Sequence, residues 1–259
     1  MTEPLSAAVI SQFNPAQLAL FLDFDGTLVE MASRPHLVEL APEVLCDIEW
    51  MHSGAGAVAI ITGREIAEID RFFAPLVLPV AGVHGLVRRR ADGGTQQLAA
   101  HEDAIGQMHE SLLPFARQHP SLLLERKQGS VALHYRLRPE LEQVCRDAME
   151  QAVAGLEDLR ILRGKMVIEA KAAAADKGVA VAAFLEEPPF SGKVPVFAGD
   201  DVTDEDAFAE VNRLNGISIK VGTGDTVARY RVADVLALHG LLRELAGRIQ
   251  TQPREQKPA

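Results

Sequence analysis

Four short apolar segments, each ending in an acidic or glycine-containing turn, constrain the fold of this chain most. They are LALFLDFDG (18–26), VAIITGRE (58–65), VPVFAGDD (194–201) and ISIKVGTG (217–224). Runs this short and this continuously apolar are typical of strands buried on both faces, as in a parallel sheet. Helix-like stretches lie between and after them, at 41–51, 65–73, 177–185 and 234–249. The alternation of strand, loop and helix predicts a doubly wound, Rossmann-like α/β core, in which ligands bind at the carboxyl ends of the strands.

This alternation stops between residues 94 and 170. The patterns there predict an antiparallel strand pair, a long helix and one further strand, at 122–128, 130–137, 139–156 and 164–171. We therefore predict a smaller α+β cap inserted into the core. The predicted division is a core of residues 1–93 and 171–259, a cap of residues 94–170, and a disordered polar tail at 251–259.

Composition narrows the partners of the protein. With 26 basic and 36 acidic residues and a net charge of −10, the surface should repel nucleic acid and anionic lipid, and the Arg88 to Arg90 run is expected to be a solvated face. The two cysteines, Cys46 and Cys145, have no neighbour at metal-ligand spacing and are expected in the core. The first residues lack a signal-peptide pattern and no apolar run is long enough to span a bilayer, so we expect a soluble cytoplasmic protein without a membrane partner.

Two acids, Asp23 and Asp25, emerge where the first apolar segment ends. Residues two apart in an extended chain point the same way, so both carboxylates should face one cleft. Gly26 and Thr27 follow as a turn that lets the chain leave the sheet. Taken alone, the pair is better explained by an ordinary loop with an Asx-turn and a helix cap, because such pairs are common in loops, and that alternative stays open.

A second acidic cluster, GDDVTDEDAF (199–208), follows another predicted strand. Part of it is structural, because Thr203 and Asp206 have the spacing of a capping box. Capping does not account for Asp200 and Asp201. Like charges about 4 Å apart cost roughly 4 kcal/mol per pair at an effective dielectric of 20, so we infer a divalent cation beside both acidic clusters. Ligands that offer only oxygen indicate Mg²⁺, the ion that accompanies phosphate groups.

Two further residues fit a phosphate opposite the metal. Thr62 ends the second apolar segment just before a predicted helix and offers a hydroxyl and backbone N–H groups. Lys177 stands at a helix start, where the helix dipole does not favour a cation. Its ammonium makes sense there if it neutralises a bound anion.

The motifs DFDGTL, ITGR, DKG and GDDVTDED, in this order, resemble the four motifs of the haloacid dehalogenase superfamily of aspartate-nucleophile phosphatases. Within it, the chain is similar to the trehalose-6-phosphate phosphatases over about residues 18 to 250. The similar segments are AGVHG (81–85), VALHYR (131–136), GKMVIEAK (164–171), DKGVAVAAFL (176–185) and GDDVTDEDAF (199–208). One departure is the run Ala172 to Ala175, where relatives tend to carry Pro and Gly. An alanine run favours helix, so we predict a stiffer linker between cap and core.

The resemblance implies Mg²⁺-dependent hydrolysis of trehalose 6-phosphate, the last step of trehalose biosynthesis, with possible coupling to a trehalose-phosphate synthase. Asp23 would be the nucleophile and Asp25 the general acid and base, while Thr62 and Lys177 would take phosphate oxygens. The implied metal site comprises Asp23, Asp25 through its backbone carbonyl, Asp200, and Asp201 and Asp204 as further ligands or orienting residues. The implied substrate-binding residues are Gly63, Arg64 and His84 in the core and Glu125, Lys127, Arg136, Lys165 and Glu169 in the cap.

Several alternatives remain at this point. The charged cap positions also fit a solvated sheet face with cross-strand ion pairs, and His84 also fits an inward-facing core histidine. A phosphatase for another sugar phosphate, such as sucrose-phosphate or a glycosyl-phosphoglycerate, would use the same core with different cap chemistry. A catalytically silent binding or regulatory module would be expected to have lost a nucleophile or a metal ligand, but Asp23, Asp25 and Asp200 are all present.

Overall fold

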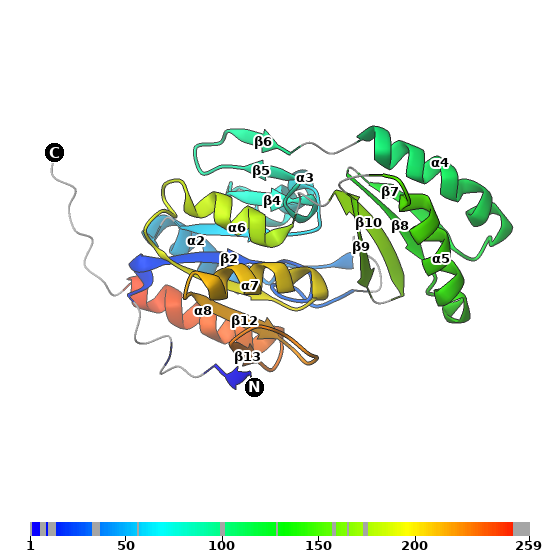
Figure 1. The fold of residues 1–259 in the computed structure, drawn as a ribbon. Coiled ribbons are helices and arrows are strands. Elements are labelled where there is room, and N and C mark those ends of the chain that lie inside the picture. Colours follow the sequence, from blue (N-terminus) through cyan, green and yellow to red (C-terminus); the bar gives the residue numbers. More distant parts are fainter. Residues whose placement is uncertain are drawn as a thin grey trace. The chain divides into compact units, whose positions relative to one another are not determined.

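The computed structural model describes residues 2–5, 9, 14–32, 37–55, 57–98, 102–127, 129–156, 159–164, 166–172 and 176–250. The chain forms two compact units, residues 1–96 with 177–259, and residues 97–176 (Figure 1). The sequence-based cap limits, 94 and 170, lie a few residues before these junctions. We call the first unit the core and the second the cap, and describe each by itself.

The core contains a nine-stranded sheet. Its strands, in spatial order, are β1 (Glu3–Pro4), β13 (Tyr230–Val232), β12 (Ile217–Val221), β11 (Val194–Gly199), β2 (Leu18–Leu22), β3 (Val58–Ile61), β4 (Val80–Gly82), β5 (Val87–Arg89) and β6 (Thr95–Gln97). Every neighbouring pair from β1 to β4 is parallel, and β5 turns back antiparallel to β4. The four apolar segments form β2, β3, β11 and β12, so the predicted parallel sheet is confirmed.

Helices cover both faces of this sheet (Figure 1). They are α2 (Pro42–Ala55) and α8 (Val235–Gln250) on one face, α6 (Lys177–Leu185) and α7 (Glu205–Arg213) on the other, and α3 (Ile66–Phe73) after β3. Side chains alternate between the two faces along β2, because successive residues of a strand point to opposite sides. Leu20 and Leu22 join the apolar cluster of α2 and α8, whereas Phe21 joins that of α6 and α7. The doubly wound architecture is therefore the one that the sequence predicts.

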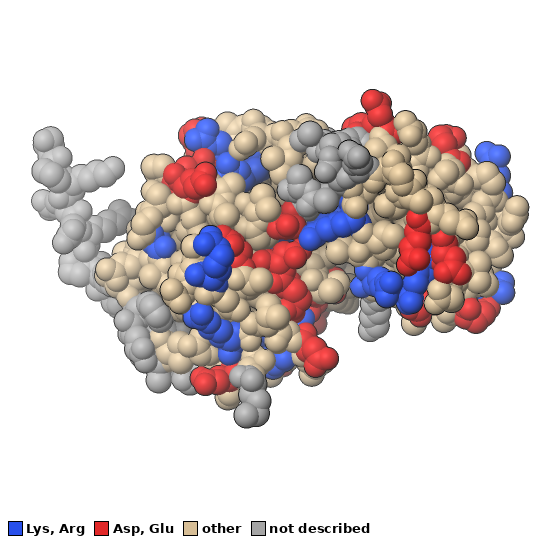
Figure 2. Space-filling model, viewed as in Figure 1, with Lys and Arg blue, Asp and Glu red and all other residues tan. Residues whose placement is uncertain are grey.

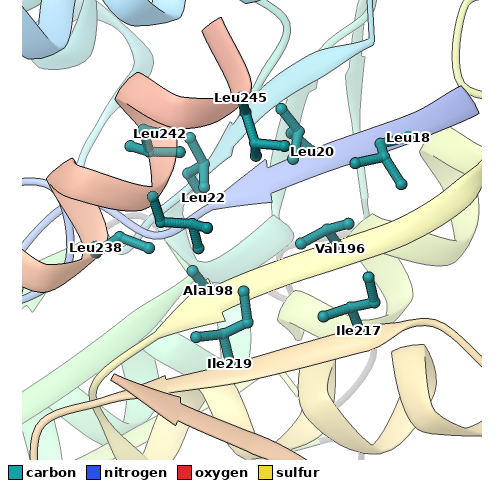
Figure 3. A pocket seen from close by; sticks show the side chains of 11 residues that line it. Leu18, Leu20, Leu22, Val196, Ala198, Ile217, Ile219, Leu238, Leu242 and Leu245 are labelled. Atoms are coloured by element: carbon teal, nitrogen blue, oxygen red, sulfur yellow. The ribbon is translucent and has the colours of Figure 1, made fainter. Parts of the chain in front are cut away.

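The packing between α8 and the sheet is tight. A void of about 10 Å³ lies there, and its lining is entirely aliphatic (Figure 3). The lining residues are Leu18, Leu20, Leu22, Val196, Ala198, Ile217, Ile219, Leu238, Leu241, Leu242 and Leu245. The lining offers no polar group, and a space of this size holds no more than a water molecule, so the void is part of the hydrophobic core.

The cap is a four-stranded antiparallel sheet with two helices. Its elements are β7 (Leu123–Lys127), β8 (Ser130–His134), β10 (Val167–Ala172) and β9 (Leu159–Gly164), in this spatial order, with α4 (Glu102–Gln118) and α5 (Glu142–Val153). The predicted antiparallel pair across Gly129 is confirmed as β7 and β8. Alternation gives the sheet two unlike faces. Val131, Leu133 and Ile168 pack with the helices, whereas the opposite face carries polar side chains such as Glu125, His134 and Glu169 around Ala132.

Several sequence-based expectations need correction or lie outside the description. Cys46 is exposed on α2, although it was expected in the core, whereas Cys145 is buried as expected. The basic run is not simply a solvated face, because Arg88 is 8% exposed and pairs with Glu187 at 2.7 Å. Ala172 ends β10, while Ala173 to Ala175, Lys165 and the tail 251–259 lie outside the described residues. Among the described helices, none has the length and apolar character needed to cross a membrane.

Candidate active site

Asp23 lies directly after β2 and is 4% exposed. Its Oδ1 accepts a hydrogen bond from Lys177 Nζ at 2.7 Å, and its Oδ2 accepts one from Thr27 Oγ1 at 3.3 Å. Lys177 is the first residue of α6. The end of β2 and the start of α6 therefore bring the two side chains together across more than 150 residues of sequence. Both oxygens of Asp23 are thus held in a fixed orientation.

Asp204 is fully buried and binds the other side of the same ammonium. Lys177 Nζ donates to Asp204 Oδ1 at 2.6 Å, and Asp204 Oδ2 accepts from the backbone N–H groups of Asp200 and Asp201, each at 2.9 Å. Burial acts to lower the pKa of Lys177, but the carboxylates of Asp204 and Asp23 outweigh it and hold this pKa above its ordinary value. With both oxygens engaged by the protein, Asp204 is suited to orient the loop that carries Asp200.

The capping box in this loop differs from the expected one. The carboxylate that reaches back to the N-cap backbone is that of Asp204, whose partner is the N–H of Asp201. Sequence spacing favoured Thr203 and Asp206, which would place the N-cap two residues later than the observed N-cap, Asp201.

Asp200 follows β11 and presents an oxygen that the described residues leave without a hydrogen-bond partner. Its Oδ1 is buried and accepts no hydrogen bond from any described residue. Its carboxylate lies against Gly26, where a Cβ would come within 2.2 Å of Oδ2, and Gly26 has a φ of +78°. Burial, followed by the charges of Asp204 and Asp201, raises the pKa of Asp200 to about 7, although Lys177 and Lys220 oppose the shift. A bound cation would strongly favour the ionised form of a carboxyl group in this environment.

Oxygen atoms of Asp23, Asp200 and Asp204 lie within 4.8 Å of one another. Burial and the neighbouring charges of Asp204 and Asp200 raise the pKa of Asp23 well above its ordinary value, despite Lys177. A divalent cation would reverse this effect by favouring the ionised forms. The buried oxygen of Asp200 and the absence of sulfur or nitrogen ligands in this cluster fit a hard metal ion. The carboxylates of Asp25 and Asp201 are not part of this group.

Asp25 is instead bound by Arg64. Arg64 Nε and Nη2 donate to the two oxygens of Asp25, both at 2.6 Å, in a bidentate pair. The guanidinium lies over the rings of Phe24 and Phe72 at 5.3 and 5.4 Å, and Arg64 is 9% exposed. The hydrogen bond with Asp25, against the effect of burial, raises the pKa of Arg64. In this structure Arg64 orients Asp25, and its expected role in substrate binding stays a prediction.

Thr62, Gly63 and His84 lie together at the same edge of the core sheet. The Thr62 N–H donates to Ala81 O at 2.9 Å, so among the backbone N–H groups expected to meet phosphate here this one is already engaged. Its hydroxyl oxygen accepts from Arg64 N at 3.1 Å and keeps its own O–H as a donor. His84 has a φ of 54° in the left-handed region, and its ring lies against Gly63, where a Cβ would come within 2.7 Å of it. A side chain at position 63 would therefore have to displace the His84 ring.

Lys220 is the residue of this region that the sequence analysis missed. It lies in β12, directly beside Gly199 of β11, and is 4% exposed. Its Nζ donates a hydrogen bond to the backbone carbonyl of Asp200. A single charge inside the apolar run ISIKV was the available signal, because buried lysines are rare unless they are paired.

The charge distribution agrees with a cation site in the core. Figure 2 shows acidic side chains gathered beside the N-terminal end of α7, where the loop of Asp200 and Asp204 begins this helix, whereas basic and acidic groups are interspersed elsewhere on this face. A local excess of acidic side chains attracts a divalent cation and repels a partner that is itself rich in carboxylates.

Three of the expected sugar-binding residues of the cap, Glu125, Lys127 and Glu169, lie on the polar face of its sheet. Glu125 and Glu169 both pair in register with Ala132, so the three side chains occupy one row across β7, β8 and β10. Glu125 Oε2 lies 3.0 Å from His134 Nε2 and 3.5 Å from Lys127 Nζ. Glu169 Oε1 is buried and has no hydrogen-bond partner among the described residues. Arg136 is exposed beyond the end of β8, and the structure does not bring it into this row.

The doubly wound core, a buried aspartate at the end of its central strand, a lysine at a helix start and an acidic loop after the neighbouring strand together define a phosphatase of the haloacid dehalogenase class. The family model described as trehalose-phosphatase matches residues 21–236. The chain belongs to the trehalose-phosphatase family.

Individual relatives agree with this membership. The chain is 37% identical over 256 residues to the trehalose-6-phosphate phosphatase of Escherichia coli K12, which covers 98% of this chain and 95% of that protein. It is 32% identical over 235 residues to the bifunctional trehalose-6-phosphate synthase/phosphatase of Thermoproteus tenax, covering 87% of this chain and 31% of that longer protein. The solved C-terminal domain of Candida albicans trehalose-6-phosphate phosphatase has the same fold, with a TM-score of 0.82 at 21% identity, over 95% of this chain and 98% of that one.

Proposed function

We propose that this protein hydrolyses trehalose 6-phosphate to trehalose and phosphate through an aspartyl-phosphate on Asp23. The observation that carries the proposal is the Asp23 carboxylate, buried and held by Lys177 and Thr27, beside an Asp200 oxygen that has no hydrogen-bond partner in the described part of the chain. The names of the relatives supply the substrate, since the core residues can recognise only a phosphate group and a metal ion.

In the proposed first step, an oxygen of Asp23 attacks phosphorus while the bond from phosphorus to the sugar oxygen breaks. Asp25 gives its proton to the departing sugar oxygen, so the carboxyl becomes a carboxylate. Arg64 donates to both oxygens of Asp25 in the free protein, so one of these hydrogen bonds has to be released when an Asp25 oxygen carries the proton, and Arg64 then stabilises the carboxylate that the step leaves behind. The Thr62 hydroxyl and the Lys177 ammonium are the donors proposed for the phosphate oxygens.

In the second step, water attacks the phosphorus of the aspartyl-phosphate and gives its proton to the Asp25 carboxylate. This releases phosphate, restores the Asp23 carboxylate and returns Asp25 to its protonated form. When bound, Mg²⁺ neutralises and orients the phosphate oxygens. Asp23 and Asp200 are the proposed protein ligands of Mg²⁺, and Asp204 orients Asp200 through its backbone N–H.

We place recognition of the sugar on the polar face of the cap sheet. Glu169 is the strongest candidate, because its buried Oε1 has no donor among the described residues and a sugar hydroxyl would supply one. Glu125 and Lys127 lie on the same face, and Lys165 remains a sequence-based member of the set. The alternative of a solvated face explains the Glu125 ion pairs with His134 and Lys127 but leaves the buried oxygen of Glu169 unexplained.

Phosphate release from a panel of sugar phosphates tests the proposal. With Mg²⁺ present, trehalose 6-phosphate should be hydrolysed with the highest kcat/KM, ahead of sucrose 6-phosphate and glucose 6-phosphate. A higher kcat/KM for another sugar phosphate would identify that compound as the preferred substrate and leave the core mechanism unchanged. No phosphate release from any of the compounds would favour a catalytically silent module. Because a relative is named as a fused synthase and phosphatase, a trehalose-phosphate synthase is the proposed functional partner.

A further inference from the structure

Lys220 is a buried cation whose position ordinary core packing does not explain. It is 4% exposed in β12, between apolar residues on the same strand, and burying an ammonium group is costly unless it is bound. The other buried lysine near it, Lys177, is bound by two carboxylates. Lys220 forms no ion pair within the described part of the chain, and its hydrogen bond goes to the backbone carbonyl of Asp200.

This hydrogen bond lies at the point where the acidic loop leaves the sheet. The β11–β12 register sets Lys220 beside Gly199, one residue before Asp200. Asp204 holds the N–H of Asp200, and Lys220 holds its C=O. Both backbone groups of this residue are therefore fixed by charged side chains, and the carboxylate between them keeps a free buried oxygen, Oδ1, with no donor among the described residues.

We propose that Lys220 is a positioning residue of the metal site, which fixes the backbone of Asp200 so that its Oδ1 is held ready for the cation. This inference deepens the proposed function and rests on its metal site, but not on the identity of the sugar. Partners that orient metal ligands commonly change metal affinity 10- to 100-fold when they are removed.

Two effects of Lys220 on metal affinity have opposite signs, which makes the inference testable. As a positive charge, Lys220 repels a cation, so its removal would tighten metal binding. As the donor that fixes Asp200, it favours the liganding geometry, so its removal would weaken metal binding. The inference requires the second effect to be the larger one.

The experiment is calorimetric titration of MgCl₂ into the metal-stripped full chain, without substrate, for the wild type, Lys220→Met and Ser218→Ala. Ser218 is the matched control, because it is fully buried on the same strand and its hydroxyl donates to Asn212 and accepts from the N–H of Arg229 without touching Asp200. We expect Lys220→Met to raise the Kd for Mg²⁺ at least fivefold, while Ser218→Ala changes it less than twofold.

A smaller rise in Kd for Lys220→Met, tighter binding, or an equal loss in Ser218→Ala would overturn the inference. Circular dichroism melts establish that each variant is folded. If Lys220→Met does not fold, Lys220→Gln takes its place under the same fivefold criterion, since its amide is one bond shorter and lacks the charge. Failure of the proposed function is recognised separately, because a wild type that binds Mg²⁺ but does not hydrolyse trehalose 6-phosphate leaves this result intact.

Discussion

Replacing Glu169 by alanine should affect catalysis and stability in opposite directions. Glu169 lies on the polar face of β10, half-buried, with an Oε1 that accepts no hydrogen bond from the described residues. If this oxygen binds a sugar hydroxyl, its loss removes a hydrogen bond to a charged group, worth about 1.5 to 3 kcal/mol. At about 1.4 kcal/mol per factor of ten, kcat/KM for trehalose 6-phosphate should fall roughly 10- to 150-fold.

The same substitution should not destabilise the free protein. A buried polar atom without a partner costs roughly 1 to 3 kcal/mol, so its removal should leave Tm unchanged or raise it. Hydrolysis of p-nitrophenyl phosphate should hardly change, because that substrate has no sugar. Glu150→Ala is the matched control, because Glu150 lies on α5 of the same unit, is mainly exposed and, among the described residues, makes only a 3.7 Å ion pair with Arg163.

The assay measures kcat and KM for both substrates and Tm by circular dichroism for the wild type and the two variants. The reasoning is refuted if Glu169→Ala changes both substrates in parallel, or if it leaves trehalose 6-phosphate hydrolysis within twofold of wild type. A Tm several degrees below that of wild type, with Glu150→Ala unaffected, would show that Glu169 serves the fold of the cap.

Three further predictions concern the core. Asp25→Asn should slow hydrolysis of trehalose 6-phosphate far more than that of p-nitrophenyl phosphate, whose leaving group departs without a proton, and equal losses would argue against an acid role. Because the pKa of Asp200 is raised to about 7 from 3.8, its ionisation costs stability as pH rises between these values. In EDTA, Asp200→Asn should therefore match the Tm of wild type near pH 4 and exceed it near pH 8, while Mg²⁺ should stabilise only the wild type; a constant difference across pH would contradict this. Leu242 is buried on α8 beside the sheet, and Leu242→Ala should lower the free energy of unfolding, measured by urea denaturation, by about 3 to 5 kcal/mol. A loss below about 1 kcal/mol would show that the surrounding side chains fill the cavity left by the substitution.

The sequence predicts the core sheet well because local composition determines it. Strands buried on both faces must be continuously apolar, and β2, β3, β11 and β12 all are. The cap helix α4 was missed, since Gly106 and Pro114 interrupt its helical pattern. Three short strands of the core sheet, β4, β5 and β13, were also missed, because each is only three residues long.

Pairings between distant side chains could not be predicted, since they depend on the tertiary fold. The acids and Lys177 could be expected to share one strand edge, but not that Lys177 bridges Asp23 and Asp204. Arg64 binds Asp25 across 39 residues, and the donor geometry that decides this is absent from the sequence. Lys220 shows the same limit, because its lone charge was visible but its partner, a backbone carbonyl, was not.

The central claim is that Asp23 performs metal-dependent phosphoryl transfer from trehalose 6-phosphate. The most direct measurement is phosphate release from this substrate by the wild type with Mg²⁺, by the wild type with EDTA, and by Asp23→Asn with Mg²⁺. We predict turnover in the first sample alone, with the other two below about one per cent of it, while the melting curve of Asp23→Asn shows an intact fold. Substantial phosphate release by folded Asp23→Asn, or undiminished release by the wild type in EDTA, would contradict the account.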